Sequence, residues 1–277
     1  MAITAQEVNK LRQQTGAGMM DCKKALTEAA GDFDKAIEIL RKKGQKVSAS
    51  RSDRETSEGS VFIKTAEGGK EATLIALNCE TDFVAKNEEF LALGQGIVEI
   101  AAVNKPASVE ELKNLQLADL SVSEKIIELI GKIGEKIEIS AYERITGEQV
   151  IPYVHAGNKL GVLVALKGVN GDDETEAGRN VAMQIAAMNP LAVDKDGVDQ
   201  TLVNKEIEIG KEQALAEGKP ENIVEKIAMG KLNKFFKENT LLNQAFVKDS
   251  SMTVAKYLES VKTGLTVASF KRISIGG

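Results

Sequence analysis

The sequence contains no tryptophan, a single histidine and only two cysteines among its 277 residues. Cys22 and Cys79 have no neighbouring cysteine or histidine, so the ligand spacing of a structural zinc site is missing. Aromatic residues make up 4% of the chain, whereas 43% of its residues are hydrophobic. A core must therefore be built mainly from isoleucine, leucine, valine and alanine. The length suffices for two domains, or for one domain with appendages.

Long hydrophobic runs are also missing. No apolar stretch approaches the ~20 residues of a membrane span, and the N-terminus has no signal-peptide pattern. The 36 basic and 41 acidic residues give a net charge of -5. A nucleic-acid-binding surface usually needs clustered basic residues, and the nearest example, residues 41–54, is better explained as a solvated linker. We therefore expect a cytoplasmic protein that binds neither nucleic acid nor a membrane directly.

Residues 1–44 carry the signals of three short helices. The signals are the capping box Thr4/Glu7, the helix-breaking run TGAG at 15–18, Gly31, and the N-cap Asp32. We expect the third helix to end at Gly44. A three-helix domain is therefore predicted over 1–44, followed by a polar linker, helical in part, over 45–58.

An internal repeat relates residues 61–77 (VFIKTAEGGKEATLIAL) to residues 150–166 (VIPYVHAGNKLGVLVAL). Each copy has a β-type run, a glycine turn and a second apolar run, which is typical of an antiparallel β-hairpin. Each copy is followed by a helix-like segment. The repeat predicts an α+β core of two similar subdomains, which we place at 59–139 and 140–277.

A helical hairpin is expected within the second subdomain at 201–237. Two helical segments, 201–217 and 221–237, are joined by Gly-Lys-Pro. Small and apolar residues at helical spacing predict the contact between them: Val203, Ile207, Gly210 and Ala214 against Ile223, Ile227 and Gly230. Such a thin apolar contact favours a projecting arm, although one more packed helix pair is the alternative.

The sequence offers little for catalysis. It has no phosphate-binding loop, and no carboxylates fall at the spacing of a paired acid and base. The one histidine, His155, lies at a predicted hairpin turn. A hydrolase would need Cys22 or Cys79 to reach His155, and both cysteines are better explained as inert core thiols. An enzyme is therefore the weaker class.

Two segments place apolar side chains where water is expected. Met19 and Met20 begin the second helix. Either one of them joins the buried stripe while the other is exposed for a partner, or both fold over the small core. Residues 81–84 (TDFV) follow a predicted strand. Helical periodicity alone places Phe83 and Phe90 on one face, two turns apart, and so favours burial of Phe83.

Two longer motifs carry a resemblance to a known family. They lie at residues 15–26 (TGAGMMDCKKAL) and 78–85 (NCETDFVA). Shorter matches follow at 132–135 (KIGE), 155–157 (HAG) and 161–164 (GVLV). In this order, and over nearly the whole chain, the motifs closely resemble the bacterial translation elongation factor Ts family.

The resemblance implies a ubiquitin-associated-like (UBA-like) N-terminal domain, a core of two similar subdomains and a protruding coiled-coil hairpin. It also implies guanine-nucleotide exchange on elongation factor Tu, in its GDP-bound and nucleotide-free forms. The protein would act by protein–protein contact, not as an enzyme, and without a cofactor or metal of its own. The implied contact residues are Thr81, Asp82, Phe83 and Val84, which would dislodge Mg²⁺ from the partner, Met19 and Met20 on its nucleotide-binding domain, and His155 in the second subdomain.

In one respect the sequence departs from the family's pattern. Some members continue past the last strand into a C-terminal helix that touches the partner, whereas this sequence stops at Gly277. We therefore expect the N-terminal domain and the core to carry more of the contact. A non-enzymatic adaptor or chaperone-like binding module, whose three-helix domain docks a different protein, remains the alternative.

Overall fold

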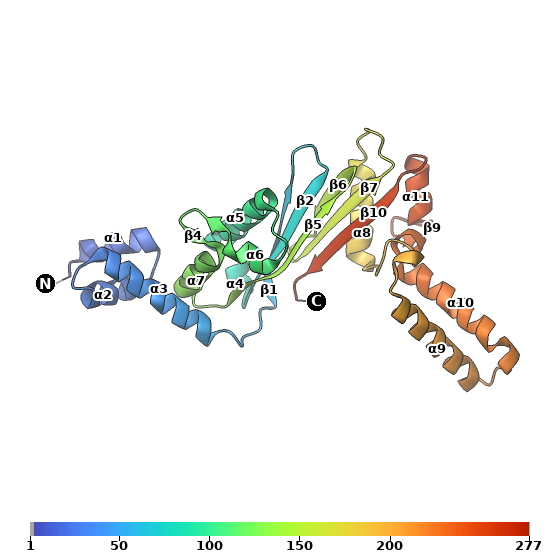
Figure 1. Cartoon of the computed structure of the whole chain (residues 1–277), viewed down its shortest axis with the longest axis horizontal. Helices are drawn as coiled ribbons and strands as arrows, with labels where there is room; N and C mark the ends of the chain where they lie inside the picture. The colour runs from blue at the N-terminus through green and yellow to red at the C-terminus, as the bar shows by residue number, and fades with distance from the viewer. Residues whose placement is uncertain (1–2, 277) are drawn as a thin grey trace.

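Helices lie at both ends of a central pair of β-sheets in the computed structural model, which describes residues 3–276 (Figure 1). The N-terminal end consists of α1 (Ala5–Thr15), α2 (Met19–Glu28) and α3 (Phe33–Ser50). The capping box of Thr4 with Glu7 and the Asp32 cap are confirmed. These helices enclose a small core of their own: Val8, Leu11, Cys22, Ala25, Leu26, Ala29 and Ala36. The three helices agree with the sequence, and their UBA-like character stays a prediction.

The third helix does not end at Gly44, because α3 continues to Ser50. Gly44 instead packs against α7 (Val122–Ile133). A Cβ atom on Gly131 of α7 would come within 2.9 Å of the Gly44 Cα, closer than a real Cβ contact allows. Glycine at these two positions therefore lets α3 and α7 pack closely, and positions 45–50 of the expected linker are helical.

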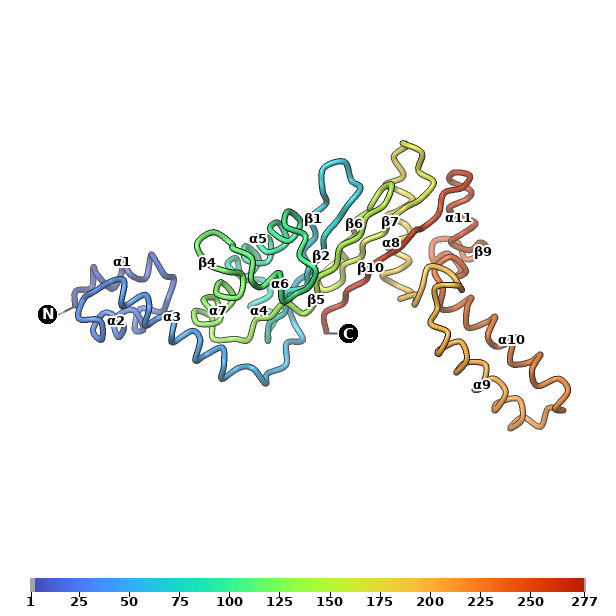
Figure 2. Tube along the Cα trace, viewed as in Figure 1, coloured from blue at the N-terminus to red at the C-terminus, as the bar shows by residue number. Residues whose placement is uncertain are grey.

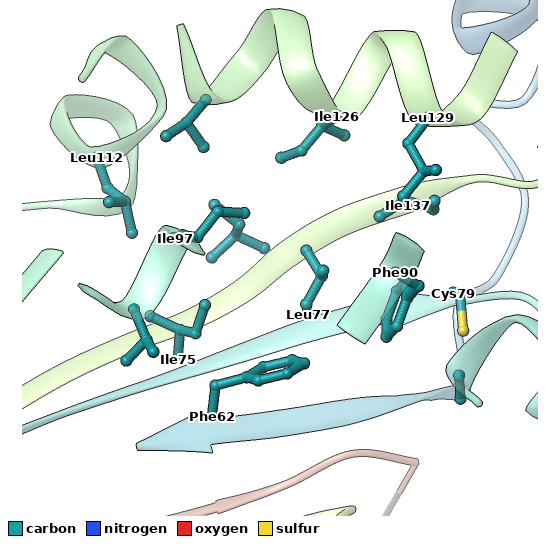
Figure 3. Packing of buried hydrophobic residues seen from close by; sticks show 14 of the residues in the cluster. Phe62, Ile75, Leu77, Cys79, Phe90, Ile97, Leu112, Ile126, Leu129 and Ile137 are labelled. Atoms are coloured by element: carbon teal, nitrogen blue, oxygen red, sulfur yellow. The ribbon is translucent and has the colours of Figure 1, made fainter. Parts of the chain in front are cut away.

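The first sheet has the order β1-β2-β5, and both of its strand pairs are antiparallel. Its strands are β1 (Glu58–Thr65), β2 (Glu71–Cys79) and β5 (Ile137–Thr146). Between β2 and β5 the chain forms α4 (Asp82–Ala85), α5 (Glu88–Asn104), α6 (Val109–Asn114), β3 (Gln116–Leu117), β4 (Leu120–Ser121) and α7. The boundary expected at 139/140 falls inside β5. One face of this sheet, α5 and α7 enclose a core that includes Phe62, Ile75, Leu77, Phe90, Ile97, Ile126, Leu129 and Ile137 (Figure 3).

The second sheet repeats this plan in the order β6-β7-β10, again with antiparallel pairs. Its strands are β6 (Gln149–Val154), β7 (Leu160–Lys167) and β10 (Thr266–Ser274), and α8 (Thr175–Met188) and α11 (Val254–Val261) pack on it. In both halves a hairpin and a helix are followed by a third strand that pairs with the second hairpin strand. The two antiparallel hairpins predicted from the repeat are confirmed.

The two sheets pack against each other through the faces that their helices leave free. Small and branched side chains from both sheets form this contact: Ala72, Leu74, Ile145, Val150, Leu163 and Ala165. The Val61 amide donates to the Asn158 carbonyl at 2.7 Å across the same contact. Figure 2 shows the strands of the two halves running side by side. This packing of the two sheets brings the β6–β7 turn close to the start of β1.

A helical hairpin projects from the second half (Figure 1). It consists of α9 (Gln200–Ala216) and α10 (Glu221–Asn239), flanked by short elements: Lys195–Gly197, Leu241–Asn243, β8 (Ala245–Phe246) and β9 (Asp249–Thr253). On α9, Gly210 and Ala214 are buried as expected. On α10 the expected contact residues were wrong, because the buried positions are Val224, Ala228, Leu232 and Phe236, while Gly230 is exposed. Helical spacing fits both sets, but the buried Val224 and Ala228 are each one position beyond the expected Ile223 and Ile227, which is about 100° around the helix.

Alanine substitution at two helical glycines tests the close packing of α3 on α7. Gly131→Ala is expected to lower the free energy of unfolding by about 1–2 kcal/mol, because overpacking outweighs the gain in helix propensity. Gly230→Ala, whose methyl group would meet no atom within 4 Å, is expected to raise it by up to ~1 kcal/mol. Urea unfolding of both variants measures the difference. Equal stabilisation by both would show that the α3–α7 contact tolerates a methyl group.

Candidate partner-binding surface

The TDFV segment forms the short helix α4, and Phe83 points away from the protein. Thr81 is the N-cap, and its hydroxyl accepts from the Val84 amide at 3.4 Å. Val84 and Ala85 are buried, whereas Phe83 is 82% exposed. A large apolar ring is thus held in water by a helix whose other face is anchored in the core.

The periodicity that favoured burial of Phe83 was wrong because Phe83 and Phe90 do not belong to one helix. α4 ends at Ala85, and Asn87 caps a new helix, α5, by accepting from the amides of Glu89 and Phe90. The helical phase restarts at this cap. Phe90 is fully buried and Phe83 is exposed.

Charged side chains flank the Phe83 ring. Lys86 donates to the Asp82 carboxylate at 2.7 Å, and both side chains are largely exposed. This hydrogen bond and charge lower the pKa of Asp82, and the charge of Lys159 adds to the effect. Asp82 is therefore an anion, and the surface combines one apolar ring with an exposed ion pair.

His155 belongs to the β6–β7 turn, which lies at the same edge of the core as α4. Lys159 in this turn pairs with Glu58 at the start of β1 at 2.6 Å. The end of α4 lies on the same part of β1, because the Ser60 hydroxyl donates to the Ala85 carbonyl at 3.5 Å, so the turn and α4 are neighbours. The His155 ring is exposed and its Nδ1 lies 2.9 Å from the Tyr153 hydroxyl. The sheet packing thus brings two segments about 70 positions apart in the chain onto one edge.

Met19 and Met20 are both exposed, at 56% and 63%. The expectation that one of them joins the buried stripe, or that both fold over the small core, was wrong, because the inward face of α2 begins only with Cys22 and continues through Ala25 and Leu26. The loop before Met19 lies against the core, where the Lys132 side chain of α7 contacts Gly16. The two methionines thus form a second exposed apolar site, on the N-terminal helices.

The cysteine–histidine pair of a hydrolase does not form. Cys22 and Cys79 are fully buried, whereas His155 is exposed and bonded to Tyr153. Burial raises the pKa of the Cys79 thiol to about 12, so it stays protonated near neutral pH. Within residues 3–276 no group of three potential ligand residues could hold a metal ion. No helix of that range is long and apolar enough to cross a bilayer.

Two glutamates that the sequence did not single out hold the base of α4. Glu135 accepts from the Thr81 amide at 3.0 Å and from the Thr81 hydroxyl at 2.7 Å. Glu80 accepts from the Lys136 amide at 2.7 Å and pairs with Arg54 at 2.8 Å. The only sequence signal for Glu135 is its place at the end of the KIGE motif, and the motif itself does not reveal which atoms it contacts.

Comparison with known proteins places the chain in a family. The family model described as Elongation factor TS matches residues 80–277. A protein named Elongation factor Ts from Amoebophilus asiaticus is 58% identical over 276 residues, covering 100% of both chains. Proteins of the same name are 60% identical in Cytophaga hutchinsonii, with 99% of each chain covered, and 45% identical in Clostridium kluyveri, with 99% of this chain and 93% of the relative covered. The chain therefore belongs to the elongation factor Ts family.

Proposed function

We propose that this protein is a guanine-nucleotide exchange factor for elongation factor Tu and works in the cytoplasm. It promotes GDP release and stabilises the nucleotide-free partner until GTP binds. The observation that carries the proposal is the 82% exposed ring of Phe83 on a helix whose opposite face is buried. Such a ring contributes little to folding, and burial in a partner would account for its place. The membership of the chain in the elongation factor Ts family supports elongation factor Tu as that partner.

The proposed mechanism is a wedge. Nucleotide is held on the partner by phosphate contacts and by a magnesium ion that neutralises phosphate charge. Phe83 enters the partner and shifts the helix that supports this ion, while Thr81, Asp82 and Val84 present the ring. Loss of the ion weakens diphosphate binding. No covalent chemistry takes place on the exchange factor, so it is not an enzyme in the usual sense.

Insertion of one ring cannot supply all of the free energy that fast nucleotide exchange requires. Burying a phenylalanine contributes about 1.5–3 kcal/mol, and each tenfold change in rate requires about 1.4 kcal/mol. Phe83 therefore accounts for one to two orders of magnitude. The remaining binding energy comes from a broader interface: Met19 and Met20 on the partner's nucleotide-binding domain, and His155 in the second half of the core. The helical arm offers a further contact.

Coupling between the exchange factor and the nucleotide is reciprocal. If this protein weakens the binding of nucleotide to the partner, then rebound nucleotide must weaken the binding of this protein by the same factor. GTP binding therefore releases the exchange factor, and one molecule can act on many partners.

Release of fluorescent GDP from elongation factor Tu tests the proposal. Catalytic amounts of this protein are expected to accelerate release at least tenfold in the presence of excess unlabelled nucleotide. Because the factor is released after each round, the acceleration should persist when the factor is present well below the partner concentration. An unchanged release rate would contradict the proposal and favour an adaptor role instead.

A further inference from the structure

Glu135 is the side chain that fixes the start of α4. It lies between Gly134, which ends α7, and the first residue of β5. Its two carboxylate oxygens accept separately, one from the Thr81 amide and the other from the Thr81 hydroxyl. Because the hydroxyl proton is directed toward Glu135, the oxygen lone pairs are free to accept from the Val84 amide. Glu135 thus orients the group that caps α4.

This contact is one half of a reciprocal pair. The Glu80 carboxylate accepts from the amide of Lys136, the residue after Glu135, while the Glu135 carboxylate accepts from the amide of Thr81, the residue after Glu80. Cys79, the last residue of β2, pairs with Ile137, the first residue of β5. Glu80 and Thr81 follow Cys79 directly, and Glu135 and Lys136 directly precede Ile137. The two carboxylates therefore continue the strand pairing with side chains, and the chain can turn away into α4 without leaving these amides unpaired.

The two glutamates differ in their other contacts. Glu80 also pairs with Arg54 at 2.8 Å, so it ties the segment after α3 to the sheet. The Glu135 carboxylate bonds to Thr81. Removing Glu80 would disturb the attachment of α3, whereas removing Glu135 acts first on α4.

A four-residue helix needs such an anchor. Isolated helices shorter than about 12 residues are marginal in water, and α4 spans only Asp82–Ala85. The exposed Phe83 ring makes little contact that could fix its own direction. Its direction is set by the buried side chains of Val84 and Ala85 on one side and by the cap at Thr81 on the other.

We propose that Glu135 is a positioning residue for nucleotide exchange, which acts through Thr81 to hold the Phe83 ring in the orientation that enters the partner. This inference rests on the proposed function. Without the Glu135 carboxylate, α4 still packs through Val84 and Ala85 but its first turn loosens, and the ring samples directions that do not fit the partner. Misplacement of a reacting or contacting group by about 1 Å can cost up to 10²-fold in rate.

The test compares Glu135→Ala, Phe83→Ala and the double variant as full-length proteins in the fluorescent GDP release assay. Glu135→Ala is expected to slow release roughly tenfold and to melt within a few degrees of the wild type. Glu135→Gln keeps the side-chain volume and one acceptor oxygen, so its GDP release rate is expected to lie between those of the wild type and Glu135→Ala. It serves as the second variant if alanine destabilises the fold. Glu110→Ala removes the same charge from an exposed position on α6 and should exchange like the wild type.

The double variant separates positioning from general destabilisation. If Glu135 acts through Phe83, adding Glu135→Ala to Phe83→Ala slows release no further, whereas a structural defect would multiply the two losses. Multiplied losses, or wild-type release by Glu135→Ala alongside slow release by Phe83→Ala, would overturn the inference and leave the proposed function standing. Wild-type release by Phe83→Ala would instead contradict the wedge itself.

Discussion

Replacing Phe83 by alanine is expected to slow GDP release from elongation factor Tu by about one to two orders of magnitude. The ring is 82% exposed in the free protein, so it contributes little to the fold, whereas in the proposed mechanism it enters the partner. The free energy of unfolding should therefore change by less than ~0.5 kcal/mol, as for other surface substitutions. Stopped-flow fluorescence of labelled GDP measures the rate, and urea unfolding followed by circular dichroism measures the stability.

Phe83→Leu refines this prediction. A leucine side chain keeps much of the apolar area but not the flat ring, so its rate should lie between those of the wild type and the alanine variant. Release at the wild-type rate by Phe83→Ala would show that the exposed ring is not the wedge. A large loss of stability in the same variant would show that the ring packs in the fold.

The second large effect is expected on stability, at Phe90. Phe90 is fully buried against the first sheet, in the core that also contains Leu77, Ile97 and Ile137 (Figure 3). Truncating a buried phenylalanine to alanine removes its transfer free energy and leaves a cavity, which together cost about 3–5 kcal/mol. Urea unfolding of Phe90→Ala should show a loss of this size.

The variants Phe83→Ala and Phe90→Ala form a matched pair that separates effects on nucleotide exchange from effects on stability. The chemical change is identical and the two positions are seven apart, yet one substitution should affect exchange and the other stability. At a temperature where Phe90→Ala remains folded, its exchange rate should exceed that of Phe83→Ala. A stability loss below ~1 kcal/mol at Phe90 would contradict its place in the core.

Much of the fold follows from local signals in the sequence. The repeat at 61–77 and 150–166 predicted two antiparallel hairpins, because alternating apolar runs around a glycine turn have few other stable arrangements. The capping box at Thr4 and the Asp32 cap predicted the starts of two helices, because their side-chain oxygens accept from amides that the helix itself leaves free. Such signals act over three or four positions and need no knowledge of the rest of the chain.

The failures come from contacts between distant parts of the chain. Gly44 was expected to end α3, but the partner that requires a glycine there is Gly131 on α7. The inward face of α10 was assigned to Gly230, whereas packing on α9 uses Ala228. In each case the local pattern allowed two solutions, and tertiary packing selected the other one.

In the candidate site, too, features that depend on contacts between distant residues could not be predicted from local sequence signals. Periodicity alone placed Phe83 inward, and only the resemblance to a family pointed to its exposure, because the cap at Asn87 that restarts the helix carries a weak sequence signal. Glu135 could not be linked to Thr81 from the sequence, since the two residues are 54 positions apart and meet only when β2 pairs with β5. The neighbouring position of the His155 turn likewise depends on how the two sheets pack.

The dependence of the Phe83 effect on magnesium tests the wedge most directly. GDP release from elongation factor Tu would be measured with wild-type protein and with Phe83→Ala, first in millimolar Mg²⁺ and then in excess EDTA. If the ring acts by displacing the ion, the wild type should be at least tenfold faster in Mg²⁺, and the two rates should converge when EDTA has already removed the ion. A rate ratio that stays the same in both conditions would contradict the proposed mechanism.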